Sequence, residues 1–307
     1  MIPQFPIFKK LELSDCDEVE IYTREYLPYA EFQFSTMICW EIHKPLQLSV
    51  LNNNLLIKQT NCLNGEYFLS LLGTTLLTET LREIAYFLHQ NNLPIQLACI
   101  PEEMVKSLDE KNVQITEDRD NFDYVYAVSD LLHAKGNKYK IYRHKRSGFI
   151  KTYSGINIEH IDLKDVSIKQ QVVALFDTWK TNKEEKGREA ESVIEFRALA
   201  RLLSCAHEFN NLKAFGVFDH GEMIAFSINE INPDKYMTGL FWKANTQYKG
   251  IYQFLMNEIV TFSSEAGIEY LNWESDLGIK SLCDSKLALN PANFLKKFVI
   301  DLRGFSE

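Results

Sequence analysis

The chain has 307 residues, of which 46% are hydrophobic and 24% charged, and its formal net charge is −9. This composition is typical of a soluble globular protein with one large or two modest domains, and it excludes a global positive field that would attract nucleic acid or anionic lipid. The six cysteines are scattered without a C-x-x-C pair, the N-terminus does not resemble a signal peptide, and no apolar run reaches the ~20 residues of a membrane span, so we expect a cytoplasmic protein.

Hydrophobic patterning predicts irregular structure with short helices over residues 1–45 and a series of strands and helices after them. A run of three asparagines, Asn52 to Asn54, is typical of a hairpin turn between the first two strands. The expected elements are strands 46–51, 53–60 and 66–72, a helix 76–90, a strand 94–100, a short helix 101–111, and strands 113–118 and 122–128.

The second half of the sequence repeats this order. Its hairpin at Asp219 to Gly221 lies 168 positions after Asn53, and an amphipathic helix again follows the third strand. We therefore expect an α/β fold with mixed sheets, in which residues 1–150 and 151–307 are two GNAT-like halves of a tandem acyltransferase fold. The second half is expected to carry the site. Its elements are strands 213–219, 222–230 and 235–243, a helix 251–266, a strand 268–273, a short helix 277–286 and a strand 294–302.

Three helical segments are predicted between the repeated units, over residues 131–153, 161–187 and 189–209. The charged stretch 180–189 interrupts the apolar pattern of the last two, so we interpret it as a mobile loop.

The stretch 241–267 reads as a strand end, a polar turn and an amphipathic helix. Backbone N–H groups at a helix start attract anions, and a glycine lets a ligand approach closely. Gln247-x-x-Gly250 fits the pyrophosphate loop [Q/R]-x-x-G-x-[G/A] of GNAT acyltransferases, although Tyr252 stands where that pattern has Gly or Ala. An ordinary capped helix is the alternative. The candidate donor-binding residues are Lys243, Asn245, Gln247, Lys249 and Gly250.

A basic segment runs from Lys135 to Lys151 with seven Lys or Arg residues and no acid, which is a conspicuous concentration in an acidic chain. A solvated helix face is the structural explanation. The functional explanation is a site for the phosphates of a cofactor, a lipid headgroup or tRNA. The candidate phosphate-binding residues are Lys138, Arg143, Lys145 and Arg146.

The stretch NWESDLG follows a strand and precedes a short helix, which places its acids at the carboxyl edge of a sheet, where open α/β sheets bind ligands. Two neighbouring carboxylates can act as a base or bind an ammonium group. Glu274 and Asp276 are therefore the candidate catalytic residues, with Asn272 as a further substrate contact. The alternative for Asp276 is a helix cap. No metal site is expected, because His207-Glu208 lacks the second histidine of H-E-x-x-H.

Several stretches together resemble the C-terminal catalytic domain family of phosphatidylglycerol lysyltransferase, in its soluble stand-alone form. The resemblance covers roughly residues 5–300 and is most specific in K-A-N-T-x-Y-K-G and E-x-D-L-G-I-x-x-L. It implies a tandem GNAT fold similar to the peptidoglycan aminoacyltransferases that use aminoacyl-tRNA. Two positions depart from the family pattern: His144 stands in its K-R-N stretch, and Trp273 replaces an arginine.

These observations predict an aminoacyl- or acyl-transferase that moves an activated acyl group onto an amine or hydroxyl acceptor. Aminoacyl-tRNA or acyl-CoA is the expected donor, and a small molecule or lipid headgroup is the expected acceptor. The alternatives are an acyl-CoA-dependent N-acetyltransferase and a non-catalytic GNAT-like module that binds RNA or a nucleotide. Because Tyr252 would crowd a pyrophosphate, the donors other than CoA are favoured.

Overall fold

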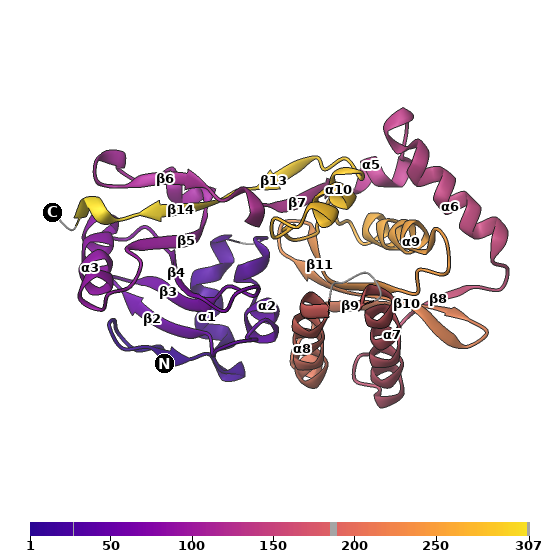
Figure 1. The fold of residues 1–307 in the computed structure, drawn as a ribbon, viewed down its shortest axis with the longest axis horizontal. Helices are drawn as coiled ribbons and strands as arrows, with labels where there is room; N and C mark the ends of the chain where they lie inside the picture. The colour runs from indigo at the N-terminus through magenta and orange to yellow at the C-terminus, as the bar shows by residue number, and fades with distance from the viewer. Residues whose placement is uncertain (27, 185–188, 306–307) are drawn as a thin grey trace. The chain divides into compact units, whose positions relative to one another are not determined.

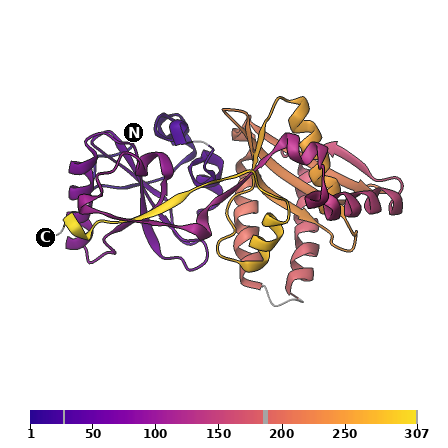
Figure 2. The same ribbon diagram turned by 90° about the horizontal axis from the view of Figure 1, so that it is seen from above.

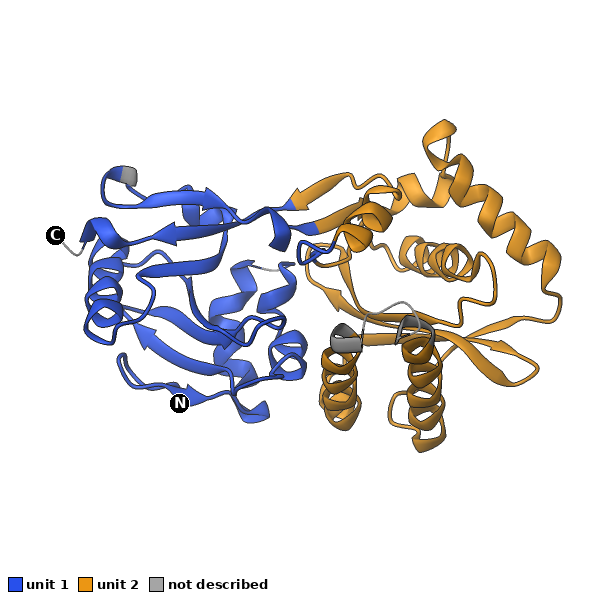
Figure 3. Ribbon diagram, in the orientation of Figure 1, with its two compact units in different colours: residues 1–123, 275–279, 295–307 blue, residues 124–274, 280–294 orange. Residues whose placement is uncertain are grey.

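The computed structural model describes residues 1–26, 28–184 and 189–305, and the chain divides into two compact units (Figures 1 and 3). Unit 1 comprises residues 1–123, 275–279 and 295–307, and unit 2 comprises residues 124–274 and 280–294. Each unit thus combines segments from both halves of the sequence. The boundary predicted at residue 150 separates the two repeated halves of the sequence and does not coincide with the boundaries of the compact units. It stays a prediction.

Unit 1 holds a four-stranded sheet of order β1-β2-β3-β4 and a three-stranded sheet of order β5-β14-β6. The predicted hairpin turn between β2 and β3 is confirmed, because Asn52 and Asn53 have φ of 51° and 62°, as a two-residue turn of left-handed backbone requires. The elements are β1 (Lys9–Lys10), α1 (Cys16–Thr23), α2 (Phe34–Cys39), β2 (Gln47–Leu51), β3 (Asn54–Thr60), β4 (Tyr67–Leu72), α3 (Leu77–Gln90), β5 (Gln96–Pro101), α4 (Glu102–Val105), β6 (Gln114–Glu117) and β14 (Lys297–Asp301).

Unit 2 holds a seven-stranded sheet of order β13-β7-β12-β11-β10-β9-β8. Helices α7 and α8 cover one face of this sheet, and α9 lies on the other (Figure 1). The elements are β7 (Asp123–Ala127), α5 (Val128–His133), α6 (Lys140–Thr152), β8 (Asn157–His160), α7 (Val166–Glu184), α8 (Glu189–Cys205), β9 (Leu212–Asp219), β10 (Glu222–Asn232), β11 (Tyr236–Ala244), α9 (Ile251–Glu265), β12 (Tyr270–Asn272), α10 (Lys280–Leu287) and β13 (Asn293–Leu295).

The predicted repeat is confirmed by the order of these elements. Both β2 to β7 and β9 to β14 run strand, strand, strand, helix, strand, helix, strand, strand. The single strand predicted over 294–302 is wrong, because it divides into β13 and β14, which belong to different sheets. Strand β8 was not predicted from the sequence, and the first predicted helical segment is broken between α5 and α6, where Ala134 and Gly136 have positive φ.

The two halves of the sequence exchange their last strands. Strand β7 ends the first half but lies between β12 and β13 in the sheet of unit 2, whereas β14 ends the second half and lies between β5 and β6 in unit 1 (Figure 2). Each exchanged strand therefore fills the same place in the other half's sheet. Within unit 1, Lys297 at the start of β14 pairs with Asp123 at 2.6 Å, and both side chains are fully buried.

The amphipathic stripe predicted for residues 251–266 is confirmed over most of α9, which buries Ile251, Leu255 and Ile259 and partly buries Phe262. The helix ends at Glu265, so Ala266 is exposed, and Gly267 follows with φ of 74°. The loop predicted over 180–189 is helical up to Glu184 and from Glu189, and the residues between them lie outside the described part of the chain. Over the described residues, no helix is long and apolar enough to cross a membrane.

Candidate functional site

The turn between β11 and α9 is organised by Asn245 and Gly250. The Asn245 side-chain oxygen accepts the Gln247 N–H at 3.1 Å, and Gly250 has φ of 92°. A Cβ at Gly250 would lie 2.4 Å from the carbonyl oxygen of Lys145 on α6. The close approach that this glycine permits is therefore made by α6 itself, which packs directly on the start of α9.

The end of α6 is also tied to this turn. The Lys249 N–H donates to the Tyr153 hydroxyl oxygen at 3.2 Å, and that hydroxyl lies 3.5 Å from the Gln247 carbonyl oxygen, which accepts from it. The side chains of Gln247 and Lys249 are exposed. The structure thus brings together two groups that are far apart in sequence, the predicted donor-binding turn and the predicted basic segment.

Two cations of the basic segment already have partners within unit 2. The Arg143 guanidinium donates to the carbonyl oxygens of Ala134 and Gly136, the latter at 2.9 Å, and so closes the break between α5 and α6. Lys138 lies 3.6 Å from the half-exposed Asp130 carboxylate. Exposed ion pairs of this kind are weak, so Lys138 can exchange its partner for a ligand, whereas Arg143 has a structural role.

The remaining cations differ in exposure. Arg146 is half-buried, and its Nε is buried without a hydrogen-bond partner among the described residues. Tyr142 and Phe149, which share the helix face of Arg146, are buried in the core beside α9. Aromatic packing therefore anchors this face of α6, and three lysines of the helix remain exposed. These are Lys140, Lys145 and Lys151, and the exposed Lys135 precedes the helix.

Lys243, near the end of β11, is buried with 5% of its surface exposed. Its ammonium pairs with Glu195 on α8, donates to the Trp242 carbonyl oxygen at 3.2 Å, and lies 4.4 Å from the centre of the Trp179 ring. Burial of an ammonium is costly unless it is paired and hydrogen-bonded, and here it is both. In this arrangement the charge of Lys243 is committed to Glu195.

Tyr252 lies at the second position of α9 and is half-buried. Burial raises the pKa of Tyr252 to about 12, and the nearby Glu195 carboxylate adds to the rise, whereas the Ala244 backbone and the Trp179 side chain oppose it. The hydroxyl is therefore neutral at physiological pH. The loop pattern identifies Tyr252 as a departure, but the helical patterns of α7 and α8 do not distinguish Trp179 or Glu195 from the residues around them.

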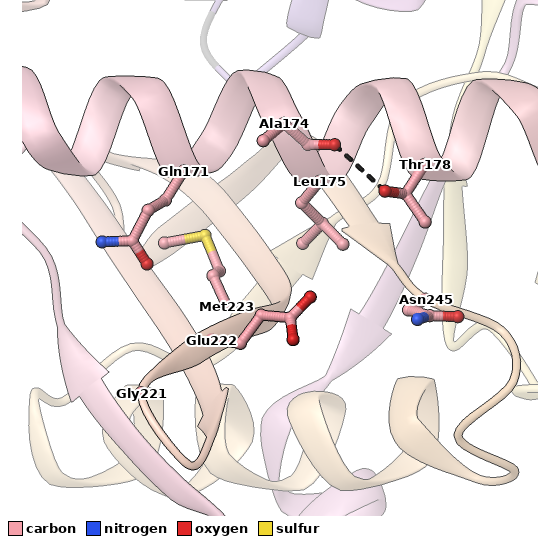
Figure 4. A pocket seen from close by; sticks show the side chains of 8 residues that line it. All are labelled: Gln171, Ala174, Leu175, Thr178, Gly221, Glu222, Met223 and Asn245. Carbon is pink, nitrogen blue, oxygen red and sulfur yellow. Dashed lines mark hydrogen bonds between the residues drawn. The ribbon is translucent and has the colours of Figure 1, made fainter.

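A cavity of about 330 Å³ opens beside the same turn (Figure 4). Helix α7 contributes one wall, the β9–β10 hairpin a second, and Asn245 a third. Amide, hydroxyl and carboxylate groups alternate with apolar side chains around it, so the cavity suits a small ligand with both characters. The lining residues are Gln171, Ala174, Leu175, Thr178, Gly221, Glu222, Met223 and Asn245.

The two predicted catalytic acids belong to different units, Glu274 to unit 2 and Asp276 to unit 1. Glu274 is half-buried with φ of 51°, and its N–H donates to the buried Asn272 side-chain oxygen at 2.7 Å. Its carbonyl oxygen accepts the Lys286 ammonium at 3.1 Å. These contacts hold the backbone just after β12 in a left-handed conformation, which a glutamate adopts only at a cost in free energy.

Asp276 is 2% exposed, and one of its oxygens accepts the Gly278 N–H at 2.9 Å while the other lies 3.5 Å from the Arg119 guanidinium. It caps the turn that precedes α10, which begins at Lys280, three residues after the helix start predicted from the sequence. The contacts of Asp276 are therefore those of a cap, as the alternative for this residue expected, although it caps a turn and not a helix.

The predicted donor turn and Glu274 lie at different levels of the sheet. Asn272 on β12 is in register with Thr238 on β11, and Ala244 lies six residues further along β11. Because the two strands are parallel, Glu274 lies two residues further in the same direction, so its offset from Ala244 is about four residues, or roughly 13 Å in an extended strand. A ligand that touches both regions must span this offset. Trp273, at the position where the family pattern has arginine, packs on Gly239 and on the Trp242 ring, whose centre is 4.8 Å away. Within the described residues, no group of three or more His, Cys, Asp or Glu side chains is placed to hold a metal ion.

The sequence of this chain matches a known protein family. The family described as phosphatidylglycerol lysyltransferase, C-terminal, matches residues 23–301 of the chain. No curated protein matches the sequence significantly. Among solved structures, a conserved protein of unknown function from Bacteroides thetaiotaomicron VPI-5482 is similar, with 24% identity and a TM-score of 0.83 over 98% of this chain and 100% of that chain.

Two further solved structures share the fold at lower identity. L-PGS from Bacillus licheniformis has 12% identity and a TM-score of 0.62 over 98% of this chain and 93% of that chain. FemX has 9% identity and a TM-score of 0.55 over 95% of this chain and 96% of that chain. The predicted tandem GNAT-like acyltransferase fold is thereby confirmed.

Proposed function

Because this chain belongs to the family of phosphatidylglycerol lysyltransferase C-terminal domains, we propose that it transfers an aminoacyl group from aminoacyl-tRNA to an amine or hydroxyl acceptor. Family and fold support an acyl- or aminoacyl-transferase of GNAT type. We propose further that the donor is a charged tRNA and that the acceptor is a small molecule or a lipid headgroup.

One observation carries the choice of a polyanionic donor. The exposed lysines of α6 lie on the helix that packs against the β11–α9 turn, because the Lys145 carbonyl oxygen contacts Gly250 and the Tyr153 hydroxyl bonds the backbone of Gln247 and Lys249. A phosphodiester backbone that follows α6 would therefore arrive at the turn and at the cavity bordered by Asn245. Phosphate contacts from lysine and arginine position such a ligand without reading its sequence.

Acyl transfer from an activated ester needs little covalent help from the protein. Holding the acceptor and the acyl carbon together can supply about 7–11 kcal/mol of the barrier. We assign Gln247 and Lys249 to the donor, with Gly250 seating α6 beside them, and Glu274 to the acceptor ammonium, which it would bind or deprotonate. Asp276 would support the loop that carries Glu274, because its carboxylate is engaged by Gly278 and Arg119.

The proposal is tested by measuring tRNA binding against salt concentration with fluorescence anisotropy. Each phosphate contact releases about 0.7 to 0.9 counterions, so binding by wild type should weaken steeply as salt rises. Charge reversal of Lys140, Lys145 and Lys151 should lower the affinity and flatten the slope by roughly 0.7 to 0.9 for each phosphate that is no longer neutralised. Reversal of the exposed Lys164, which lies outside α6, is the matched control and should change neither quantity.

Transfer is measured on the same samples by mass spectrometry of mixtures that contain charged tRNA and candidate amine acceptors. A product that carries the aminoacyl group is the expected result. Steep salt-dependent binding without any deacylation above background would instead support the non-catalytic RNA-binding module. A variant with all three lysines reversed that binds tRNA as wild type does would contradict the proposal.

A further inference from the structure

The loop that carries Glu274 is held by the last turn of α10. The half-buried Lys286 donates through its ammonium to the carbonyl oxygens of Trp273 and Glu274, the latter at 3.1 Å. The Trp273 carbonyl belongs to the peptide group before the Glu274 Cα atom, and the Glu274 carbonyl belongs to the peptide group after it. One cation therefore restrains both peptide planes that flank Glu274, and with them its φ and ψ.

This restraint acts on a backbone conformation that glutamate seldom adopts. Glu274 lies just after β12 and has a φ of 51°, in the left-handed region. In an extended strand successive carbonyl groups point in opposite directions, so two consecutive carbonyls can reach one ammonium only where the chain turns. A cation that binds both carbonyls therefore favours the left-handed conformation, and strained residues of this kind persist only where the surrounding contacts fix them.

Backbone contacts with β7 hold the same segment. The Trp273 N–H donates to the Tyr124 carbonyl oxygen at 2.9 Å, and the Glu274 carbonyl oxygen accepts the Tyr124 N–H at 3.2 Å. The bonds from Lys286 differ from these because their donor is charged, which makes them roughly twice as strong as bonds between neutral groups. Lys286 therefore adds the stronger restraint on Glu274, and it extends this restraint to the Trp273 carbonyl.

Helix α10, which carries Lys286, is itself fixed on β7. The Tyr126 hydroxyl donates to the Lys286 carbonyl oxygen at 2.8 Å, and the Tyr124 hydroxyl donates to the Cys283 sulfur at 3.5 Å. Both tyrosines are fully buried, and the Lys286 ammonium lies 5.6 Å from the centre of the Tyr124 ring. The strand that the first half of the sequence contributes to unit 2, beside which α10 lies in Figure 1, thus supports the loop of Glu274.

From these contacts we infer that Lys286 is a positioning residue, which holds Glu274 in the left-handed conformation and so keeps its carboxylate in one direction toward the acceptor. The inference rests on the proposed function, in which Glu274 binds or deprotonates the acceptor ammonium. Without the ammonium of Lys286, Glu274 can relax toward an extended backbone, and its side chain then points elsewhere. A displacement of about 1 Å in a reacting group can lower a rate about 100-fold, so transfer should depend on this contact.

The test measures kcat and KM for transfer from charged tRNA to an amine acceptor. Lys286→Met keeps the length of the side chain and removes its charge, so kcat should fall at least about tenfold. The KM for charged tRNA should stay at the wild-type value, because the lysines of α6 and the turn at Gln247 are untouched. Lys286→Arg, which keeps donors for both carbonyls, should recover most of the lost kcat. Lys280→Met is the matched control, because its exposed ammonium on the same helix pairs with Asp284 at 3.2 Å, and it should leave both constants unchanged.

Hydrogen exchange of the full chain, followed by mass spectrometry, gives a second readout that needs no activity. Residues 270–274 should exchange at least about tenfold faster in Lys286→Met than in wild type or Lys280→Met. Circular dichroism establishes that each variant is folded, and Lys286→Gln, whose amide can bond one carbonyl, replaces Lys286→Met if the latter does not fold.

Three results would overturn the inference. These are a wild-type kcat in the folded variant, a fall in kcat matched by a rise in the KM for charged tRNA, and wild-type exchange over residues 270–274. Failure of the proposed function looks different, since wild-type protein would then give no aminoacyl product with charged tRNA. The exchange measurement would in that case still decide whether Lys286 holds Glu274.

Discussion

Glu31 should make the stability of unit 1 depend on pH. It lies in a short 3-10 helix (Ala30–Phe32), and its carboxylate pairs with Lys297, which is fully buried between Glu31 and Asp123. One Glu31 oxygen is buried without a hydrogen-bond partner among the described residues. Burial raises the pKa of Glu31 to about 7; the Lys297 ammonium opposes this rise, and the Asp123 carboxylate adds to it.

The magnitude follows from the two protonation equilibria. The unfolded chain binds the Glu31 proton with a pKa of 4.5 and the folded chain with a pKa of about 7. Because the folded state holds the proton more tightly, the resulting stabilisation is fully present below pH 4.5 and is lost as the pH rises through 7. At about 1.36 kcal/mol per pKa unit, unit 1 should lose about 2 to 3 kcal/mol between pH 5 and pH 8.

The change to make is Glu31→Gln, which keeps the shape of the side chain and removes its titration. This variant should match wild type near pH 5, where Glu31 is mostly neutral, and should be more stable than wild type by about 2 to 3 kcal/mol at pH 8. Lys297 keeps Asp123 as its partner in this variant. Glu83→Gln, at an exposed position on α3, is the matched control and should leave the pH dependence of wild type in place.

Hydrogen exchange followed by mass spectrometry gives the free energy of opening for each unit separately. Peptides from β3 and β5 report on unit 1, and peptides from β9 and β10 report on unit 2. The pH effect should be confined to the first set. The reasoning is refuted if unit 1 is equally stable at both pH values, or if Glu31→Gln shows the same loss as wild type.

Three further predictions concern unit 2 and the loop beside it. Gly250→Ala should lower the free energy of unfolding of unit 2 by more than about 2 kcal/mol, because its Cβ would meet the Lys145 carbonyl oxygen and its φ is positive. Gly148→Ala, which has open space around it in α6, should raise this free energy by about 0.5 to 1 kcal/mol. Equal urea midpoints for the two variants would contradict the prediction. Asp276→Asn should cost about 0.5 to 2 kcal/mol in urea unfolding while the folded molecules keep their transfer activity, and loss of activity without loss of stability would make Asp276 catalytic. Glu274→Gln should abolish transfer with an unchanged urea midpoint, so full activity in this variant would remove Glu274 from the proposed mechanism.

The order of the elements could be predicted from the sequence because it depends on local patterns. Alternating and helical periodicity identify the strands and α9, and left-handed turns require residues such as Asn53 and Gly221, which marked the two equivalent hairpins. The repeat, the tandem fold and the family follow from this information. The exchange of β7 and β14 does not, because periodicity places a strand's apolar face but does not say which sheet receives it.

The same distinction between local pattern and tertiary contact applies to the candidate site. Residue type and spacing identified the basic segment, the turn at Gly250 and the acidic stretch at Glu274. Only the tertiary structure decided what these residues contact: Lys145 fills the space left by Gly250, and Arg143 closes a break in the backbone. Such contacts join elements far apart in sequence, and whether a charged or polar side chain meets a ligand or the chain itself depends on which elements pack beside it. For this reason Lys243, which the sequence pattern assigned to a donor, is paired with Glu195 in the folded protein.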